Sequence, residues 1–398
     1  MKYLIFILCL IAIFLLAYLV SFDRKMVKKK LKTIAIILGI QILLAYVFLH
    51  TTIGIKIIGG ASKLFEKLLG YANVGIEFVF GGMIEGGYAT FLLTALFPIV
   101  FICALLGILQ YFKILPWFIK IMGTGLNKIS RLGKLESYSA VSAVIIGMTA
   151  VFVSIKDLLP KLNKQQMYTI AACSISTVDL SIVGAYMNMI DPKFVILAII
   201  LNLFSVFVIL SIVNPYNPDE ENEALTVISQ PAEKDERGFF EILSDYMMDG
   251  FNLVLAIVAM LLGFVALVAF LNGIFDGIFG VDFQTILGYI FAPFAFLMGV
   301  PWDEAVRFGG LIATKLLSNE FVAMTSFIEM EGLSERSTGI ISVFLVSFAN
   351  FGSIGMIIGA LKGLCPDQSK VVAGFSLRLL YGATLVSFLS AAVVGLIL

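Results

Sequence analysis

Long apolar runs recur along the chain, and eight of them have the length of a transmembrane helix. About 17 to 25 mainly apolar residues span the roughly 30 Å hydrocarbon core of a bilayer as a helix. The runs lie at residues 1–22, 33–50, 92–112, 165–190, 193–213, 250–272, 337–360 and 371–398. The pattern therefore predicts an all-α polytopic membrane protein with eight transmembrane helices.

Four shorter or interrupted stretches are not expected to cross the membrane. Residues 135–160 and 301–330 are broken near the middle by small or polar residues, which predicts two re-entrant hairpins. Residues 51–80 carry charges at helical spacing, and residues 114–134 have a similar character, which predicts interfacial amphipathic helices. Because non-helical backbone is tolerated at membrane depth only inside protein or beside water, each hairpin tip should face a cavity.

Two segments with a constant offset of 171 residues indicate an internal repeat. Residues 176–184 line up with residues 347–355, since both begin with serine, end with glycine and hold Asp179 or Asn350 in the fourth position. The polar interruptions near the middle of the two predicted hairpins are also 171 residues apart. Polar interruptions at corresponding positions of a repeat are typical of a transporter's binding site. The pattern predicts an inverted repeat whose paired interruptions form such a site.

These elements divide the chain into five parts. Residues 1–134 hold the N-terminal spans and the interfacial helices, and residues 135–213 hold the first repeat, which comprises a hairpin and two spans. A cytoplasmic acidic linker at residues 214–249 precedes a span and an interfacial segment at residues 250–300. Residues 301–398 hold the second repeat, again with a hairpin and two spans.

The composition agrees with a membrane protein and excludes several classes of function. Apolar residues make up 60% of the 398 residues and charged residues 14%, with a mean hydropathy of +1.03. Soluble domains usually have about 25% charged residues. A formal net charge of zero provides no basic surface for nucleic acid. The sequence contains no HExxH, Walker A or GxSxG motif, so we expect neither an enzyme nor a bound cofactor.

A cluster of six Lys and Arg residues at positions 24–32 follows the first apolar run. Positive residues near the ends of spans are retained on the cytoplasmic side, which places the N-terminus outside. Eight spans return the C-terminus to the same side. A site for anionic membrane lipid is the alternative interpretation of the cluster. We therefore expect a multi-pass protein of the cytoplasmic membrane with both termini outside.

Asp179 and Glu320 are carboxylates in the middle of apolar sequence. Such a charge near the bilayer centre costs at least about 2.5–3.5 kcal/mol, so a functional role is the first hypothesis. The alternative is a structural acid satisfied by helix N-termini or by a partner such as Lys315. Glu320 can accept from two vicinal hydroxyls, Asn350 can donate and accept, and Ser353 can do either. This set suits a neutral polyhydroxyl ligand.

Three longer runs, at residues 291–305, 319–323 and 347–355, resemble the concentrative nucleoside transporter family. The resemblance covers essentially the whole chain. It implies eight transmembrane helices with two opposed re-entrant hairpins and interfacial helices. It also implies a homotrimer in which a transport domain moves against a scaffold, and residues 1–134 would belong mainly to that scaffold.

The resemblance assigns the ribose of a nucleoside to Glu320, Asn350 and Ser353, which match the family's motifs. The family reads the base through Gly-Gln-Thr-Glu in the first hairpin, where residues 147–150 of this chain are Gly-Met-Thr-Ala. The loss of an amide and a carboxylate changes discrimination, so we expect the base to be read by shape and by other residues. The residues expected on this side of the site are Met148, Thr149, Ile182 and Phe348.

The resemblance also implies a site for a coupling ion in the first repeat. Sodium-coupled members use an asparagine, which is Ala143 here, a hydroxyl that Thr177 retains, and carbonyls that correspond to Ile146 and Val178. The resemblance does not supply Asp179. This carboxylate could add an oxygen for Na⁺ beside Thr177, or it could carry a proton itself. The coupling ion is therefore expected to be Na⁺ or H⁺.

Together these features predict a cation-coupled secondary active symporter that imports nucleosides by alternating access. One alternative is a diverged family member that carries another small polar solute. The other is a membrane sensor or enzyme that keeps the fold and does not transport.

Overall fold

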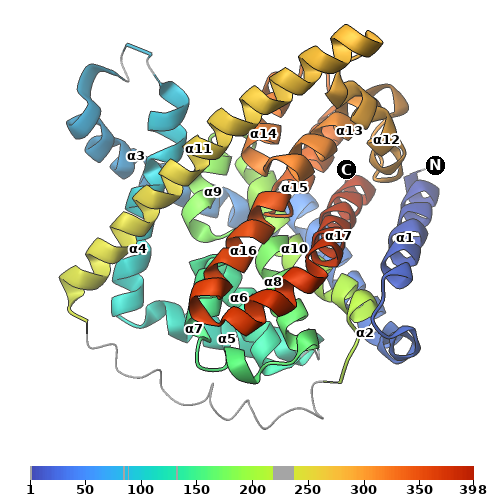
Figure 1. Cartoon of the computed structure of the whole chain (residues 1–398), viewed down its shortest axis with the longest axis horizontal. Coiled ribbons are helices and arrows are strands. Elements are labelled where there is room, and N and C mark those ends of the chain that lie inside the picture. Colours follow the sequence, from blue (N-terminus) through green and yellow to red (C-terminus); the bar gives the residue numbers. More distant parts are fainter. Residues whose placement is uncertain (1, 84–85, 88, 131–132, 218–236) are drawn as a thin grey trace.

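The computed structural model describes residues 2–83, 86–87, 89–130, 133–217 and 237–398 and is shown in Figure 1. Most of the predicted acidic linker, residues 218–236, lies outside the described residues. The regular structure of the described chain consists of helices, without a β-strand. The predicted all-α class is confirmed.

Seven described helices or helix pairs are long and apolar enough to cross a membrane, and they match seven of the eight predicted spans. Two of them are interrupted, because the third begins with a π-helical segment and the fourth is broken in the middle. They are α1 (Lys2–Leu19), α2 (Arg24–His50), η2 (Phe91–Leu96) with α4 (Pro98–Tyr111), α8 (Lys164–Ser176) with α9 (Leu180–Met187), α10 (Pro192–Val213), α11 (Phe239–Phe279) and α17 (Pro366–Ile397).

The remaining predicted span, at residues 337–360, consists of two shorter helices. α15 (Glu335–Leu345) and α16 (Phe351–Leu364) are separated by residues 346–350. The preceding α12 (Phe283–Leu297) and α13 (Trp302–Leu317) are bent by 117° relative to each other, so they do not form one straight span. The bend follows Gly299, whose φ of +106° few other residues adopt.

The two predicted hairpins are present as pairs of helices. α6 (Lys134–Ile146) and α7 (Ala150–Ser154), followed by η3 (Leu159–Lys161), form the first, and α13 and α14 (Glu320–Ile328) form the second. Several boundaries keep the 171-residue offset of the sequence repeat. They are the ends of α6 and α13 at Ile146 and Leu317, the starts of α8 and α15 at Lys164 and Glu335, and the starts of α9 and α16 at Leu180 and Phe351.

α11 is longer than predicted, because its first turns replace the end of the expected linker. The linker was expected to reach residue 249, but the helix begins at Phe239. Arg237 pairs with Asp245 at 3.0 Å, and both side chains are about half exposed. The polar first turns therefore extend the helix beyond its apolar part.

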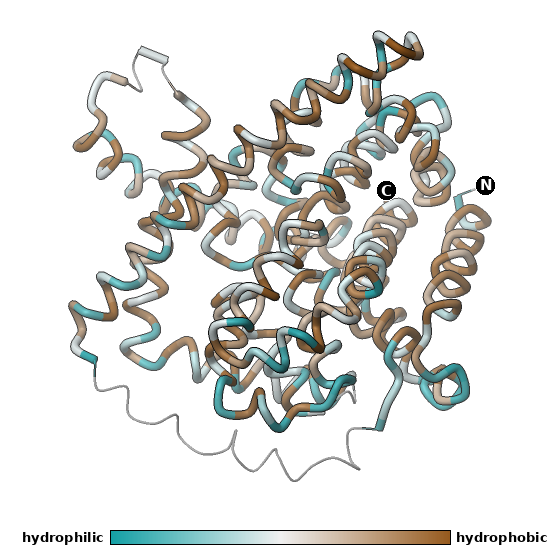
Figure 2. Tube along the Cα trace, in the orientation of Figure 1, coloured by the Kyte–Doolittle hydropathy of each residue, from teal (hydrophilic) through white to brown (hydrophobic). Residues whose placement is uncertain are grey.

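The interfacial helices are α3 (Thr52–Phe80), followed by η1 (Gly81–Met83), and α5 (Ile114–Ser130). α3 begins where Thr51 Oγ1 accepts a hydrogen bond from the Gly54 amide at 3.1 Å. Large apolar side chains such as Phe78 remain exposed on α3, as expected for a helix that lies against lipid. Figure 2 shows that the long helices are hydrophobic along most of their length and that hydrophilic residues gather near their ends.

The interior of the protein is formed by α8, α9, α10 and α17, because most residues in the apolar parts of these helices are buried. In contrast, α11 is largely exposed along its length and packs against α4. Figure 1 shows α11 crossing one side of the molecule. The two termini lie close together, since Lys2 Nζ donates to the Ile397 carbonyl at 3.3 Å. The two ends of the chain therefore lie at the same face of the molecule.

Candidate functional site

Three half-helices begin inside the protein at predicted site residues or directly beside one. Asp179 caps α9 by accepting from the Ser181 amide at 2.9 Å, and Asn350 caps α16 by accepting from the Ser353 amide at 2.8 Å. Asn319 caps α14 through the Val322 amide at 3.0 Å. Helix N-termini carry partial positive charge and unpaired N–H groups. The centre of the molecule therefore attracts anionic and hydroxyl groups.

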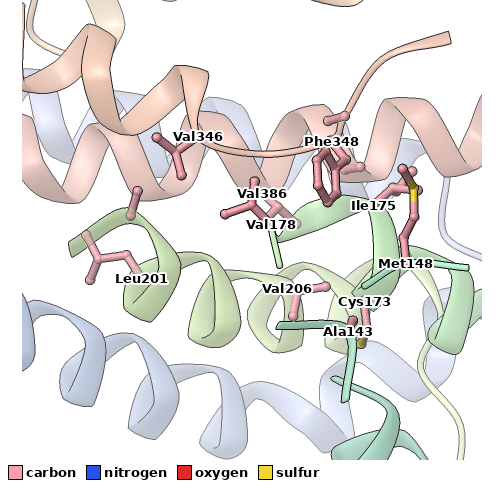
Figure 3. Packing of buried hydrophobic residues seen from close by; sticks show 14 of the residues in the cluster. Ala143, Met148, Cys173, Ile175, Val178, Leu201, Val206, Val346, Phe348 and Val386 are labelled. Carbon is pink, nitrogen blue, oxygen red and sulfur yellow. The ribbon is translucent and has the colours of Figure 1, made fainter. Parts of the chain in front are cut away.

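The breaks of the two repeats touch each other. The Phe348 amide, in the break between α15 and α16, donates to the Thr177 carbonyl, in the break between α8 and α9, at 3.3 Å. Figure 3 shows the segment that carries Val346 and Phe348 beside Val178. The candidate ion site and the candidate ribose site therefore share a backbone hydrogen bond.

Glu320 is the centre of the polar cluster, and only 4% of its surface is exposed. Its Oε1 accepts from the Tyr186 hydroxyl at 2.9 Å, and its Oε2 accepts from Asn350 Nδ2 at 2.9 Å. A carboxylate has about four lone-pair sites, so about two remain for a ligand. This capacity equals the number of hydroxyls in a vicinal diol.

Ser353 supplies a further polar group at the same place. Its side chain is buried, and its Oγ has no hydrogen-bond partner within the described structure. A buried hydroxyl without a partner is costly, and such groups often mark ligand sites. Hydrogen bonds thus connect Glu320 to the Asn350 side chain, and that side chain to the Ser353 amide.

Sequence reasoning missed Tyr186. It belongs to α9 in the first repeat, and its ring centroid lies 5.0 Å from that of Phe321 in the second hairpin. A tyrosine hydroxyl within an apolar helix usually needs a buried hydrogen-bond partner. The presence of Tyr186 in an apolar stretch was therefore the sequence signal that could have identified it. Its bond to Glu320 brings a residue of the first repeat into the polar cluster.

Apolar side chains lie on the side expected to hold the base. Met148, Ile182 and Phe348 are all buried in the hydrophobic core, and Figure 3 shows Met148 and Phe348 on the same side of the packed cluster. Thr149 is partly exposed and precedes the first residue of α7. This arrangement offers more surface for van der Waals contact than for hydrogen bonding.

Asp179 lies against the tip of the first hairpin. A Cβ atom built on Gly147 would be 3.2 Å from Asp179 Oδ2, whereas Oδ1 accepts from both the amide and the hydroxyl of Ser181. Gly147 shares its peptide bond with the Ile146 carbonyl. Thr177 Oγ1 donates to the Cys173 carbonyl at 3.2 Å. Of the residues predicted for the coupling ion, Asp179 therefore lies against the hairpin tip beside the Ile146 carbonyl, and Thr177 and Val178 directly precede it in the chain.

Hard monovalent cations bind oxygen ligands, which this region supplies as carbonyls, a hydroxyl and a carboxylate. Among the described residues, no group of three or more His, Cys, Asp and Glu is placed to hold a metal ion.

Gly147→Ala is expected to destabilise the protein by about 1–3 kcal/mol, because φ is +98° and the new Cβ meets the Asp179 carboxylate. The measurement is thermal unfolding of the purified protein in detergent. Gly125→Ala, in the exposed interior of α5 with open space around it, is the control and should leave stability unchanged or raise it slightly. Equal melting temperatures for the two variants would contradict the tight contact.

Three family models together match most of the chain. The first, described as the C-terminus of Na⁺-dependent nucleoside transporters, matches residues 194–395, and one described as their N-terminus matches residues 8–83. A third, described as nucleoside recognition, matches residues 92–193 and so includes the first hairpin.

Curated relatives cover nearly the full length. The purine nucleoside transport protein NupG of Bacillus subtilis is 35% identical over 391 residues, which are 97% of each chain. The nucleoside permease NupC of Helicobacter pylori is 27% identical and covers 96% of this chain and 95% of its own.

Solved structures show the same fold. CNTnw in an inward-facing substrate-bound state aligns with all of this chain and 98% of its own, with a TM-score of 0.92 at 30% identity. A variant of CNTnw in an outward-facing state gives a TM-score of 0.90 at 29% identity, with the same coverage.

Proposed function

Because this chain belongs to the family of Na⁺-dependent, concentrative nucleoside transporters, we propose that it is a symporter that imports nucleosides across the cytoplasmic membrane. The observation that carries the proposal is the cluster of Glu320, Asn350 and the unpartnered hydroxyl of Ser353. A cation gradient would drive the import by alternating access. Solved inward-facing and outward-facing states of CNTnw support this mode of movement.

The ribose is held by the second repeat in this proposal. Glu320 accepts from the two ribose hydroxyls with the lone pairs that Tyr186 and Asn350 leave free. Ser353 completes the set as a donor or acceptor. Hydrogen bonds to a charged group contribute about 1.5–3 kcal/mol each, which is enough to make the ribose the main determinant of affinity.

The base lies between the first hairpin and the following half-helix. Met148, Ile182 and Phe348 form an apolar wall, and Thr149 provides a hydroxyl at its edge. A thioether adapts to a ring face, so shape rather than a fixed amide selects the base. NupG of Bacillus subtilis is a purine nucleoside transport protein, which supports purine nucleosides as the first candidates.

The coupling ion binds at the tip of the first hairpin, near Ile146, Thr177, Val178 and Asp179. The description of the family as Na⁺-dependent supports sodium. The Asp179 carboxylate supplies the oxygen that Ala143 lacks, and its protonation is the alternative mode of coupling.

The assembly and orientation also belong to the proposal. We expect a homotrimer embedded in membrane lipid, with both termini on the outer side. The family resemblance supports the trimer, and the bond between Lys2 and Ile397 supports termini on one side.

Thermal unfolding with a nucleoside panel tests the proposal, because a ligand that binds the folded state raises the melting temperature. Adenosine, guanosine and uridine are compared with their 2′,3′-dideoxy forms, free ribose and adenine. Stabilisation by ribonucleosides, and at least about tenfold weaker binding of the dideoxy forms, is expected. Equal binding of both forms would contradict ribose recognition, and no response to any nucleoside would favour another small polar solute.

Tyr186→Phe is expected to weaken nucleoside binding about tenfold, because one oxygen of Glu320 loses its partner while the ring stays packed against Phe321. Isothermal titration of the purified variant measures the change. Tyr289→Phe, at an exposed position, is the control. Wild-type affinity in Tyr186→Phe would show that this bond does not organise the site.

A further inference from the structure

Lys315 is a fully buried lysine whose ammonium group lies at the inner end of α15. Its Nζ donates to the Phe344 carbonyl at 2.5 Å, in the last turn of α15, and to Ser347 Oγ at 2.7 Å, in the break. It also reaches Ser387 Oγ of α17 at 3.4 Å. An ammonium group has three donors, and three oxygens surround it here.

This place suits a cation for two further physical reasons. The C-terminal end of a helix carries partial negative charge, and in transporters the ends of half-helices and unwound carbonyls coordinate coupling ions. In addition, Lys315 Nζ lies 4.4 Å from the centroid of the Phe344 ring, whose face attracts positive charge. The lysine therefore fills a position where a free cation would be stabilised.

The corresponding place in the first repeat is different. With the 171-residue offset, Phe344 corresponds to Cys173 and Lys315 corresponds to Val144, which has no charge. The Cys173 carbonyl accepts from the Thr177 hydroxyl at 3.2 Å instead of from an ammonium group. The helix end near the proposed coupling-ion site thus lacks the lysine that the second repeat has at this position.

We propose that Lys315 is a tethered cation, which supplies at the second break the positive charge that a mobile ion supplies at the first. This inference rests on the proposed function in so far as it concerns coupling. Lys315 acts as a positioning residue, because it ties α13 and α17 to the break that leads to Asn350 and Ser353. The second repeat would then hold its ribose-binding groups in place without an added ion.

Chemical rescue of Lys315→Ala tests this directly. n-Propylammonium has the four heavy atoms that the substitution removes, and n-propanol matches its size without the charge. The concentration of the coupling ion is held constant, and choline balances the ionic strength. Under these conditions n-propylammonium should raise the melting temperature of Lys315→Ala and leave that of the wild type unchanged. Nucleoside affinity should fall at least about tenfold in the variant and recover to within about threefold with the ammonium.

Two results would overturn the proposal. One is wild-type nucleoside affinity in Lys315→Ala, and the other is an equal response of the variant to n-propanol and n-propylammonium. The melting temperatures are measured without nucleoside, so the tethered cation is tested even if the wild type binds no nucleoside, which would refute only the proposed function.

A pair of serine variants decides the matter if Lys315→Ala does not fold. Ser387→Ala removes one acceptor of the ammonium, whereas Ser390→Ala removes a buried hydroxyl of the same helix that donates to Ser205. Ser387→Ala should weaken nucleoside binding about threefold or more, and Ser390→Ala should not. Equal effects of the two substitutions would refute a specific role for the ammonium site.

Discussion

Glu320→Gln is expected to lower nucleoside affinity at least about 100-fold and to abolish measurable uptake, because two charge-assisted hydrogen bonds to the ribose become neutral ones. The amide also presents a donor where a carboxylate oxygen accepts from Tyr186 or Asn350. If the amide nitrogen faces Asn350 Nδ2, two donors meet, whereas Tyr186 can turn its hydroxyl and accept. Titration of the purified protein and uptake into proteoliposomes measure the two effects.

The control for this substitution is Glu329→Gln, which lies at the end of the same hairpin helix and is exposed. It should leave affinity and uptake unchanged. The melting temperature without ligand separates a lost binding site from a lost fold. A folded Glu320→Gln protein with wild-type nucleoside affinity would disprove the assignment of the ribose to this carboxylate.

Asp179→Asn is expected to uncouple nucleoside binding from the cation. Coupling free energies between two sites are typically about 1–3 kcal/mol, so the cation should tighten nucleoside binding about 5–150-fold in the wild type. In the variant the effect should fall below about twofold, because the carboxylate against the hairpin tip has lost its charge. Affinities measured with Na⁺ or choline, over a range of pH, report the coupling for either ion.

Asp191→Asn is a matched control for the capping role. Asp191 caps α10 through the Lys193 amide at 2.9 Å, as Asp179 caps α9 through Ser181, but Asp191 is exposed. Asparagine caps helices as well as aspartate does, so both variants should keep their helices. If Asp179→Asn retained full dependence on Na⁺ and on pH, Asp179 would be a structural cap only.

The sequence predicted the fold well because its strongest signals are local. Apolar length located seven membrane spans directly, and the 171-residue offset aligned helix boundaries as well as side chains. Asp179 and Asn350 could be found because polar side chains in the middle of apolar sequence cost free energy, and such residues mark functional sites by default. The polar start of α11 was missed, since apolar length marks only the part of a helix that lies in lipid.

Contacts between distant segments could not be predicted in the same way. Tyr186 and Glu320 are far apart in the sequence, and their hydrogen bond depends on how α9 packs against the second hairpin. From the sequence, Lys315 is a candidate partner for Glu320, five residues away. In the structure its ammonium instead donates to the end of α15, because the carbonyls left by the helix break need a donor.

The hydrogen bond between the Phe348 amide and the Thr177 carbonyl has a thermodynamic consequence. If the coupling ion orders one break, the neighbouring break is ordered as well, so part of the entropy cost of holding the nucleoside has already been met. Linkage makes this effect reciprocal at equilibrium: whatever factor the ion contributes to nucleoside affinity, the nucleoside contributes to ion affinity. Each ligand is therefore released more readily after the other has left, which disfavours a carrier that returns half loaded.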